Sequence, residues 1–113
     1  IWMDDESLID AATAVSGSGP AYVFLLAECL AEAGVEAGLD PELAARLARA
    51  TVSGAGELLR RSDLSAAELR QNVTSPKGTT AAALEVLMGK DGFADLLKRA
   101  VAAAAKRSHE LSS

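Results

Sequence analysis

The sequence predicts an all-α fold, because apolar residues recur at helical spacing along nearly the whole chain and no segment alternates as a strand does. Polar start signals and glycine stops divide this pattern into about five to six helices. Half of the 113 residues are hydrophobic and 24% are charged, which is typical of a globular chain. We treat residues 1–113 as one domain.

The first helix is expected through Ser7 to about Val15, with Asp4 or Asp5 as its N-cap. Residues 16–20, Ser-Gly-Ser-Gly-Pro, are expected to break it.

A second helix is expected from about Pro20, which suits a first turn, to Glu36, ending near glycine 34 or 38. Residues 21–27 are apolar on every side, and polar side chains return only along a narrow stripe that includes Glu28 and Glu32. A helix apolar on all sides is a buried one, so it should be the central helix of the bundle. Because so short a chain has few neighbours to surround it, a second copy is expected to complete the cover.

The third helix has Asp40 as candidate N-cap and Pro41 at its first position. Gly54 and Gly56 lie inside it, and each destabilises a helix interior by about 1 kcal/mol relative to alanine. Either another helix backbone approaches closely there, or the helix tolerates them.

Ser65 and Glu68 form a capping box that opens a short helix through about Val73. Two more helices follow, one from Thr79 or Thr80 to Met88, and one capped by Asp91 with an apolar stripe from Phe93 to Ala104.

Charge and composition exclude several classes of partner. The net charge of −5 argues against non-specific nucleic-acid binding, which needs a basic surface. The apolar run 21–27 is too short to span a bilayer, and we expect no secretory signal, since no charged region precedes an apolar one. With Cys29 as its only cysteine, the chain cannot form an internal disulfide, which favours a reducing, cytoplasmic compartment. The start at Ile1-Trp2 indicates a piece of a longer chain, the alternative being a processed terminus.

Several candidate sites fail on their residue patterns. The segment 17–19, Gly-Ser-Gly, lacks the third glycine and the preceding strand of a dinucleotide-binding loop. His109 has no second metal ligand nearby and is expected to be exposed. Cys29 is expected to be a small buried hydrophobe. Glu28 and Glu32 could pair for acid–base chemistry, but a solvated helix edge explains them as well.

The stretch 73–87, VTSPKGTTAAALEVL, has a more specific physical use. A helix that begins at Thr79-Thr80 presents unpaired N–H groups and the positive end of its dipole. Ser75 and the threonines add hydroxyls, and Gly78 lets a ligand approach the backbone. The stretch therefore suits a small carboxylate or phosphate, the alternative being an over-specified N-cap between two helices.

From about residue 2 to 111 the chain resembles the C-terminal dimerisation domain of pyrroline-5-carboxylate reductases. The resemblance rests on these segments in order: 16–22 (SGSGPAY), 54–56 (GAG), 72–76 (NVTSP) followed by 78–80 (GTT), and 92–93 (GF).

This resemblance implies a homodimer of interlocked helical domains, often assembled into rings. It implies that NADPH or NADH is bound mainly by an N-terminal Rossmann domain absent from this sequence, so the chain alone should be inactive. The implied reaction reduces the cyclic imine 1-pyrroline-5-carboxylate to L-proline.

The resemblance also assigns roles in the loop. Ser75, Gly78, Thr79 and Thr80 match residues that hold the substrate carboxylate, and Thr80 matches the catalytic threonine whose hydroxyl reaches the ring nitrogen. No metal is implied.

Lys77 departs from the family, which usually has a small residue there, most often glycine. If the position needs a positive φ, lysine is strained by roughly 1 kcal/mol or more. Otherwise Lys77 adds a cation beside the carboxylate or points to solvent. A rival hypothesis for the whole chain is a helical oligomerisation module without chemistry, which would not need the 78–80 Gly-Thr-Thr segment.

Overall fold

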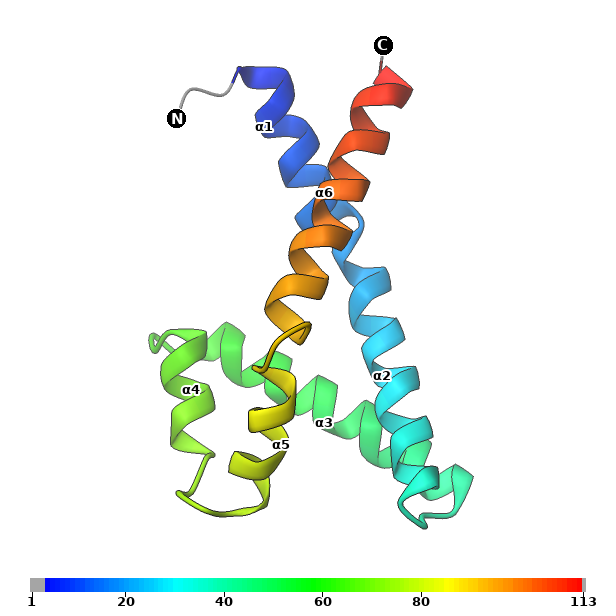
Figure 1. Cartoon of the computed structure of the whole chain (residues 1–113), viewed down its shortest axis with the longest axis vertical. Coiled ribbons are helices and arrows are strands. Elements are labelled where there is room, and N and C mark those ends of the chain that lie inside the picture. The colour runs from blue at the N-terminus through cyan, green and yellow to red at the C-terminus, as the bar shows by residue number, and fades with distance from the viewer. Residues whose placement is uncertain (1–3, 113) are drawn as a thin grey trace. The chain divides into compact units, whose positions relative to one another are not determined.

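A computed structural model describes residues 4–112, and these residues form helices with no strand (Figure 1). The elements are α1 (Asp5–Ala12), the π-helical segment η1 (Thr13–Gly17), α2 (Gly19–Glu36), α3 (Pro41–Arg61), α4 (Ala66–Asn72), α5 (Thr79–Leu87) and α6 (Phe93–Ser112). The predicted all-α class is confirmed. The chain divides into two compact units, one with α1, η1, α5 and α6, the other with α3, α4 and α2 from residue 21 onward.

In the first unit, α1 starts at Asp5 because the Asp4 carboxylate accepts a hydrogen bond of 2.7 Å from the Ser7 amide. The predicted break at residues 16–20 is largely wrong. The chain continues as η1, where the Ser18 amide donates to the Thr13 carbonyl at 2.8 Å. A π-helical turn accepts an extra residue without losing its backbone hydrogen bonds, so only Ser18 separates η1 from α2.

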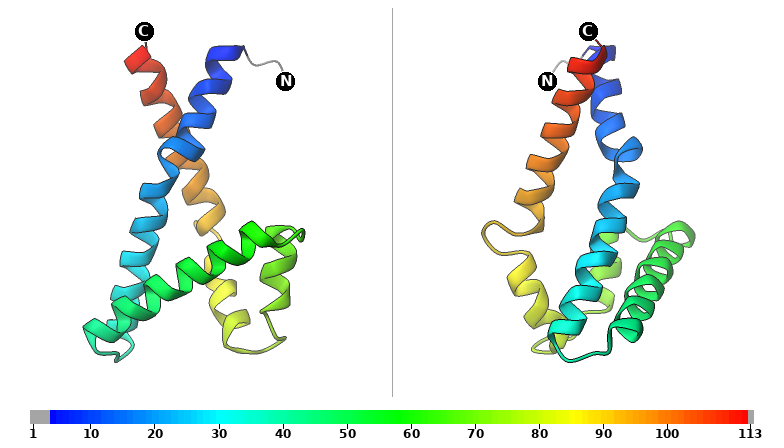
Figure 2. Two further views of the ribbon diagram at one scale, coloured as in Figure 1. Left: turned by 180° about the vertical axis from the view of Figure 1, so that it is seen from behind. Right: turned by 90° about the vertical axis from the view of Figure 1, so that its right-hand side faces the viewer.

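The helices α1 and η1 contact α6, and the views in Figures 1 and 2 show α1 and α6 crossing side by side. Ala14 is fully buried at this contact. The Asp10 carboxylate, 8% exposed, accepts a 2.6 Å hydrogen bond from the Ser108 hydroxyl. Its other oxygen lies 3.5 Å from Nδ1 of His109. His109 is exposed, as predicted, but it also faces the buried carboxylate of Asp10, which the sequence pattern does not indicate.

The start of α6 corrects the prediction that Asp91 is its N-cap. The helix begins at Phe93, so Gly92 occupies the capping position. A Cβ at Gly92 would lie 2.1 Å from the carbonyl oxygen of Leu87, so only glycine fits. Asp91 lies further upstream in the left-handed region, with a φ of 61°.

In the second unit, α2 ends before Gly38, whose φ of 113° requires glycine. The Asp40 carboxylate then caps α3 by accepting hydrogen bonds from the amides of Glu42 and Leu43, with Pro41 in the first turn. Both features are as predicted.

The capping box is also confirmed. The Ser65 hydroxyl accepts from the Glu68 amide at 3.1 Å, and the Glu68 carboxylate accepts from the Ser65 amide at 3.1 Å.

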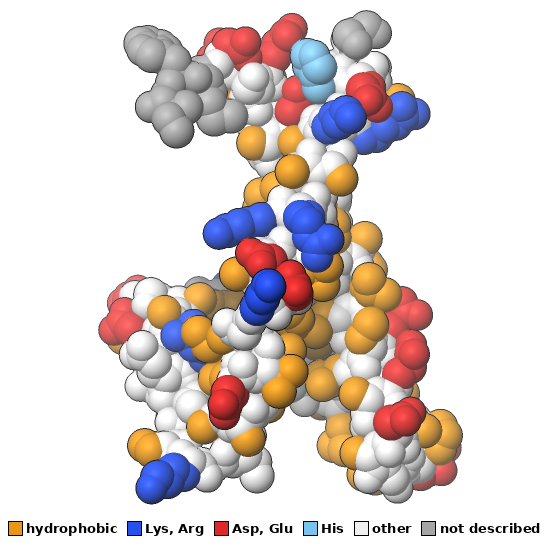
Figure 3. Space-filling model, in the orientation of Figure 1, with side chains coloured by type: hydrophobic (Ala, Val, Ile, Leu, Met, Phe, Trp, Pro, Cys, Tyr) orange, Lys and Arg blue, Asp and Glu red, His pale blue; other side chains and the backbone are white. Residues whose placement is uncertain are grey.

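The helix α2 has no buried residue in this chain, although it is apolar around its first turns. Only Ala44 and Ala48 are buried in the second unit. Phe24 is 68% exposed, and Cys29 is exposed, so the prediction of a buried cysteine is wrong for the single chain. Figure 3 shows hydrophobic side chains distributed over the visible surface. The described part of the chain therefore does not supply the cover that an apolar helix needs.

By length and composition, the helical stretch Asp5–Glu36 could cross a membrane. Core helices of non-membrane proteins have the same character, so one such stretch is weak evidence for a span.

Candidate anion-binding site

The segment 75–78 forms a tight turn in which the Gly78 amide donates to the Ser75 carbonyl at 3.0 Å. Lys77, the third residue of this turn, has a φ of 61°. This combination fits a type II turn, whose third position usually holds glycine or asparagine. The condition for strain at Lys77 is therefore met, and its side chain is exposed. A Cβ at Gly78 would lie 3.2 Å from the Ser75 carbonyl oxygen, a tight contact that favours glycine at this position.

The turn leads directly into α5, whose N-cap is Gly78 and which has no side-chain cap. In the first backbone hydrogen bond of the helix, the Ala82 amide donates to the Gly78 carbonyl. Within residues 4–112, the amides of Thr79, Thr80 and Ala81 have no hydrogen-bond partner. The prediction that this helix begins at Thr79 or Thr80 is confirmed, with Thr79 as its first residue, and its first turn keeps three free donors at the positive end of the dipole.

The four predicted site residues lie together in this turn and in the first turn of α5. Ser75 and Thr79 are exposed, whereas Gly78 and Thr80 are half-buried. Hydroxyls and free amides around a helix start can hold a small anion such as a carboxylate. In the part of the chain that the structure describes, no group of side chains could hold a metal ion.

The features that sequence reasoning missed lie outside this loop. The only sequence signal near the π-helical segment was the glycine- and proline-containing stretch 16–20, which suggested a break, and the Asp10–Ser108 pair joins residues 98 positions apart. A pattern read along the chain does not show such a pairing.

Over the described residues the chain is an all-α domain in which the start of α5 has no side-chain cap. The family described as pyrroline-5-carboxylate reductase dimerisation matches residues 6–111. The chain belongs to this family.

Individual relatives agree with the family match. The chain is 49% identical over 112 residues to a pyrroline-5-carboxylate reductase of Pseudomonas aeruginosa and 50% identical over 112 residues to one of Pisum sativum. Each alignment covers 99% of this chain and 41% of the relative, so the chain spans about two fifths of the length of these reductases.

Solved structures show the same fold. A pyrroline-5-carboxylate reductase of Coxiella burnetii matches with a TM-score of 0.89 at 43% identity, over 100% of this chain and 42% of that one. A pyrroline carboxylate reductase of Plasmodium falciparum with NADP bound matches with a TM-score of 0.87 at 40% identity, over 98% of this chain and 42% of that one.

Proposed function

We propose that this chain is the dimerisation and substrate-binding part of a cytoplasmic pyrroline-5-carboxylate reductase that makes L-proline from 1-pyrroline-5-carboxylate with NADPH or NADH. The observation that carries the proposal is the conjunction of the family match over residues 6–111 with an uncapped start of α5 behind the turn at Ser75. The family match alone would suit a module that only associates, but such a module has no use for the uncapped start of α5.

In the proposed site the substrate carboxylate is held by the free amides of Thr79 and Thr80 and by the Ser75 hydroxyl. The two amides lie at the positive end of the α5 dipole, which favours an anion. The Thr80 hydroxyl hydrogen-bonds the ring nitrogen and orients the C=N bond toward the nicotinamide. Because a threonine hydroxyl is a weak acid, its contribution is orientation rather than strong proton donation.

The cofactor supplies the hydride, and the proposal places its binding mainly in an N-terminal nucleotide-binding domain of the whole reductase. The P. falciparum relative was solved with NADP bound, which supports a nicotinamide cofactor for the family. The 113-residue chain by itself is expected to have no reductase activity. Its partner is a second copy of itself, with rings of dimers as a further stage of assembly.

Substitution of Thr80 tests the proposal in the full-length protein. Thr80→Ala removes the hydroxyl aimed at the ring nitrogen but leaves the backbone amides in place. The expected loss is about 1–3 kcal/mol of transition-state stabilisation, or roughly five- to two-hundred-fold in kcat, with a smaller change in KM.

The matched control is Thr51→Ala in α3, where the hydroxyl only donates to the Leu47 carbonyl at 2.7 Å. It should leave kcat unchanged. If Thr80→Ala keeps kcat within twofold of the parent, Thr80 is a helix-start residue only. If the full-length protein does not reduce the imine at all, the rival hypothesis of an association module stands.

A further inference from the structure

The carboxylate of Asp10 lies in the contact between α1 and α6, and the proposed reaction makes no use of it. Asp10 is only 8% exposed. One of its oxygens accepts the 2.6 Å hydrogen bond from the Ser108 hydroxyl, and the other lies 3.5 Å from Nδ1 of His109. A buried carboxylate is costly unless hydrogen bonds or an opposite charge replace its hydration. Among residues 4–112, His109 is the only basic side chain at ion-pair distance from Asp10.

The contact between His109 and Asp10 depends on charge. At 3.5 Å the nitrogen and the oxygen are too far apart for a good N–H···O hydrogen bond, which needs about 2.7–3.2 Å. A neutral imidazole therefore contributes little to the contact, whereas an imidazolium attracts a carboxylate at this distance. Histidine is the side chain that ordinarily changes its charge between about pH 5 and pH 8. The chain has one histidine, so His109 is its only imidazole that titrates there.

The charges that face His109 from α1 are negative. Besides Asp10 they include Asp4, whose pKa is lowered first by the hydrogen bonds from Ser7 and also by the positive charge of His109. The segment η1 carries no charged side chain, and on α6 itself Arg107 and Glu110 pair with each other at 3.3 Å. The other charged side chains on the same turns are exposed: Asp5, Glu6 and Lys106. A positive charge on His109 is therefore attracted to α1.

We propose that His109 and Asp10 form a pH-sensitive clasp, in which protonation of His109 tightens the contact of α6 with α1. When His109 is neutral, the buried carboxylate of Asp10 keeps the hydrogen bond from Ser108 but has no opposite charge beside it. Since the protonated form favours the folded contact, its stabilisation is present at about pH 5.5 and is lost as the pH rises toward about 8. The clasp lies within one chain and does not depend on the proposed reductase function.

Urea unfolding at about pH 5.5 and about pH 8 tests the clasp. All samples are kept at one protein concentration, so that association affects them alike. His109→Gln, at an exposed position, removes the charge and keeps a polar side chain. The equilibrium constant for folding should fall about two- to fivefold more in the parent than in this variant between the two pH values, as expected for a partly exposed ion pair. The comparison cancels every other group that titrates in this range.

His109→Arg is the converse variant, because its charge is permanent. It should keep at about pH 8 the folding constant that it has at about pH 5.5, after the change seen in His109→Gln is subtracted. Ser108→Ala is the control for the uncharged part of the contact. It should lower the folding constant by a similar factor at both pH values and leave the pH dependence of the parent in place.

Asp10→Asn keeps an acceptor for Ser108 but carries no charge, so it should lose the pH dependence as His109→Gln does. If His109→Gln depends on pH as the parent does, there is no clasp, whatever the association state or the activity of the protein. If His109→Gln removes the dependence but a folded Asp10→Asn keeps it, His109 acts on another carboxylate, and the assignment to Asp10 is wrong. An Asp10→Asn variant that does not fold leaves the decision to His109→Gln and His109→Arg, and a His109→Arg variant that loses stability like the parent also overturns the clasp.

Discussion

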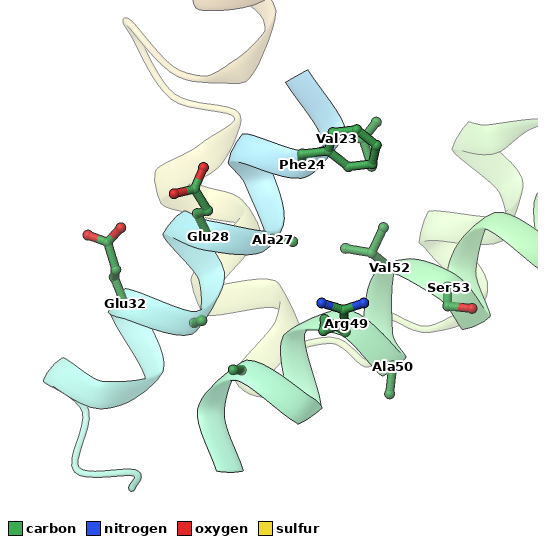
Figure 4. A pocket seen from close by; sticks show the side chains of 11 residues that line it. Val23, Phe24, Ala27, Glu28, Glu32, Arg49, Ala50, Val52 and Ser53 are labelled. Carbon is green, nitrogen blue, oxygen red and sulfur yellow. The ribbon is translucent and has the colours of Figure 1, made fainter. Parts of the chain in front are cut away.

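The helix pairs α1–α6 and α2–α3 differ in how much of their apolar surface is buried within the chain. Between α1 and α6, Asp10 and Ala14 are buried and a side-chain hydrogen bond joins Asp10 to Ser108. Between α2 and α3 an open apolar groove remains, with Val23 and Phe24 of α2 in its lining (Figure 4), and no α2 residue is buried. The first pair completes its contacts within one chain, whereas the second leaves an apolar surface exposed, and we expect a second chain to cover it. Substitutions in the two helix pairs should separate these two cases.

The largest effect is expected from Phe24→Asp in the groove. In a monomer this side chain is 68% exposed, and its replacement would cost little. Burying a phenylalanine contributes about 1.5–3 kcal/mol, so its loss from both copies should weaken the dimer by about 3–6 kcal/mol, or roughly 10²- to 10⁴-fold in Kd.

Val86→Asp on α5 is the control, since Val86 is 76% exposed and lies outside the groove. It should change Kd less than threefold. If sedimentation shows that the two substitutions raise Kd equally, the groove contributes no more to the dimer than the rest of the exposed apolar surface.

Asp10→Ala should break the pair that is complete within one chain. It removes the acceptor of the Ser108 hydroxyl and the partner of His109, and we expect a loss of about 1–3 kcal/mol in the free energy of unfolding. Denaturant unfolding at several protein concentrations measures this loss separately from association. The exposed loop residue Asp63 provides the control, because Asp63→Ala should cost less than about 0.5 kcal/mol. A loss no greater than that of the control would mean that Asp10 does not join α1 to α6.

The sequence predicted what depends on near neighbours along the chain. The cap at Asp40, the box at Ser65 and Glu68, and the start of α5 at Thr79 follow from local hydrogen bonding, and all are confirmed. The sequence also identified α2 as too apolar for its own chain to cover.

What the sequence could not show depends on distant pairings and on backbone geometry. Residues 16–20 looked like a break because glycine and proline usually end a helix, and the π-helical bonds that carry the chain through leave no residue signature of their own. At Asp91 the backbone is in the left-handed region, with a φ of 61°, rather than in the extended conformation of an N-cap, and α6 begins two residues later at Phe93. The roles of Ser75 and Thr80 stay predictions, because they depend on a substrate.

Lys77→Gly should stabilise the fold by a smaller amount. A lysine at a φ of 61° costs roughly 1–2 kcal/mol, and the greater freedom of glycine in the unfolded chain offsets about half of the gain. The expected net gain of about 0.5–1 kcal/mol raises Tm by a few degrees.

Lys90→Gly is the matched control, because Lys90 lies in a turn without a positive φ and should show no gain. Equal or lower stability of the Lys77 variant would show that the turn holds lysine without strain. Reductase kinetics on the full-length variant would show in addition whether the exposed ammonium contributes to KM.

The smallest effect concerns pH, and it should appear in both units. The hydrogen bond from the Ser7 amide holds the pKa of Asp4 below its ordinary value, and the hydrogen bond from the Ser65 amide does the same for the pKa of Glu68. A lowered folded-state pKa contributes stability that is present above the unfolded-state pKa and lost as pH falls through the folded-state value. The first turns of α1 and α4 should therefore lose stability as the pH falls from about 5 to about 2.

Circular dichroism over that range measures the change, with Glu68→Gln as the comparison. The unfolding free energy of this variant should vary less with pH than that of the parent. A parent whose helix content and unfolding free energy do not change below about pH 4 would contradict the assignment of these carboxylates as caps.

In the proposed dimer, α2 is covered by a second copy of the chain. Sedimentation velocity of the 113-residue chain at micromolar concentration tests this directly. We expect a helical species of twice the 11.6 kDa chain mass, with no folded monomer. A stable, well-folded monomer of 11.6 kDa under the same conditions would contradict the claim.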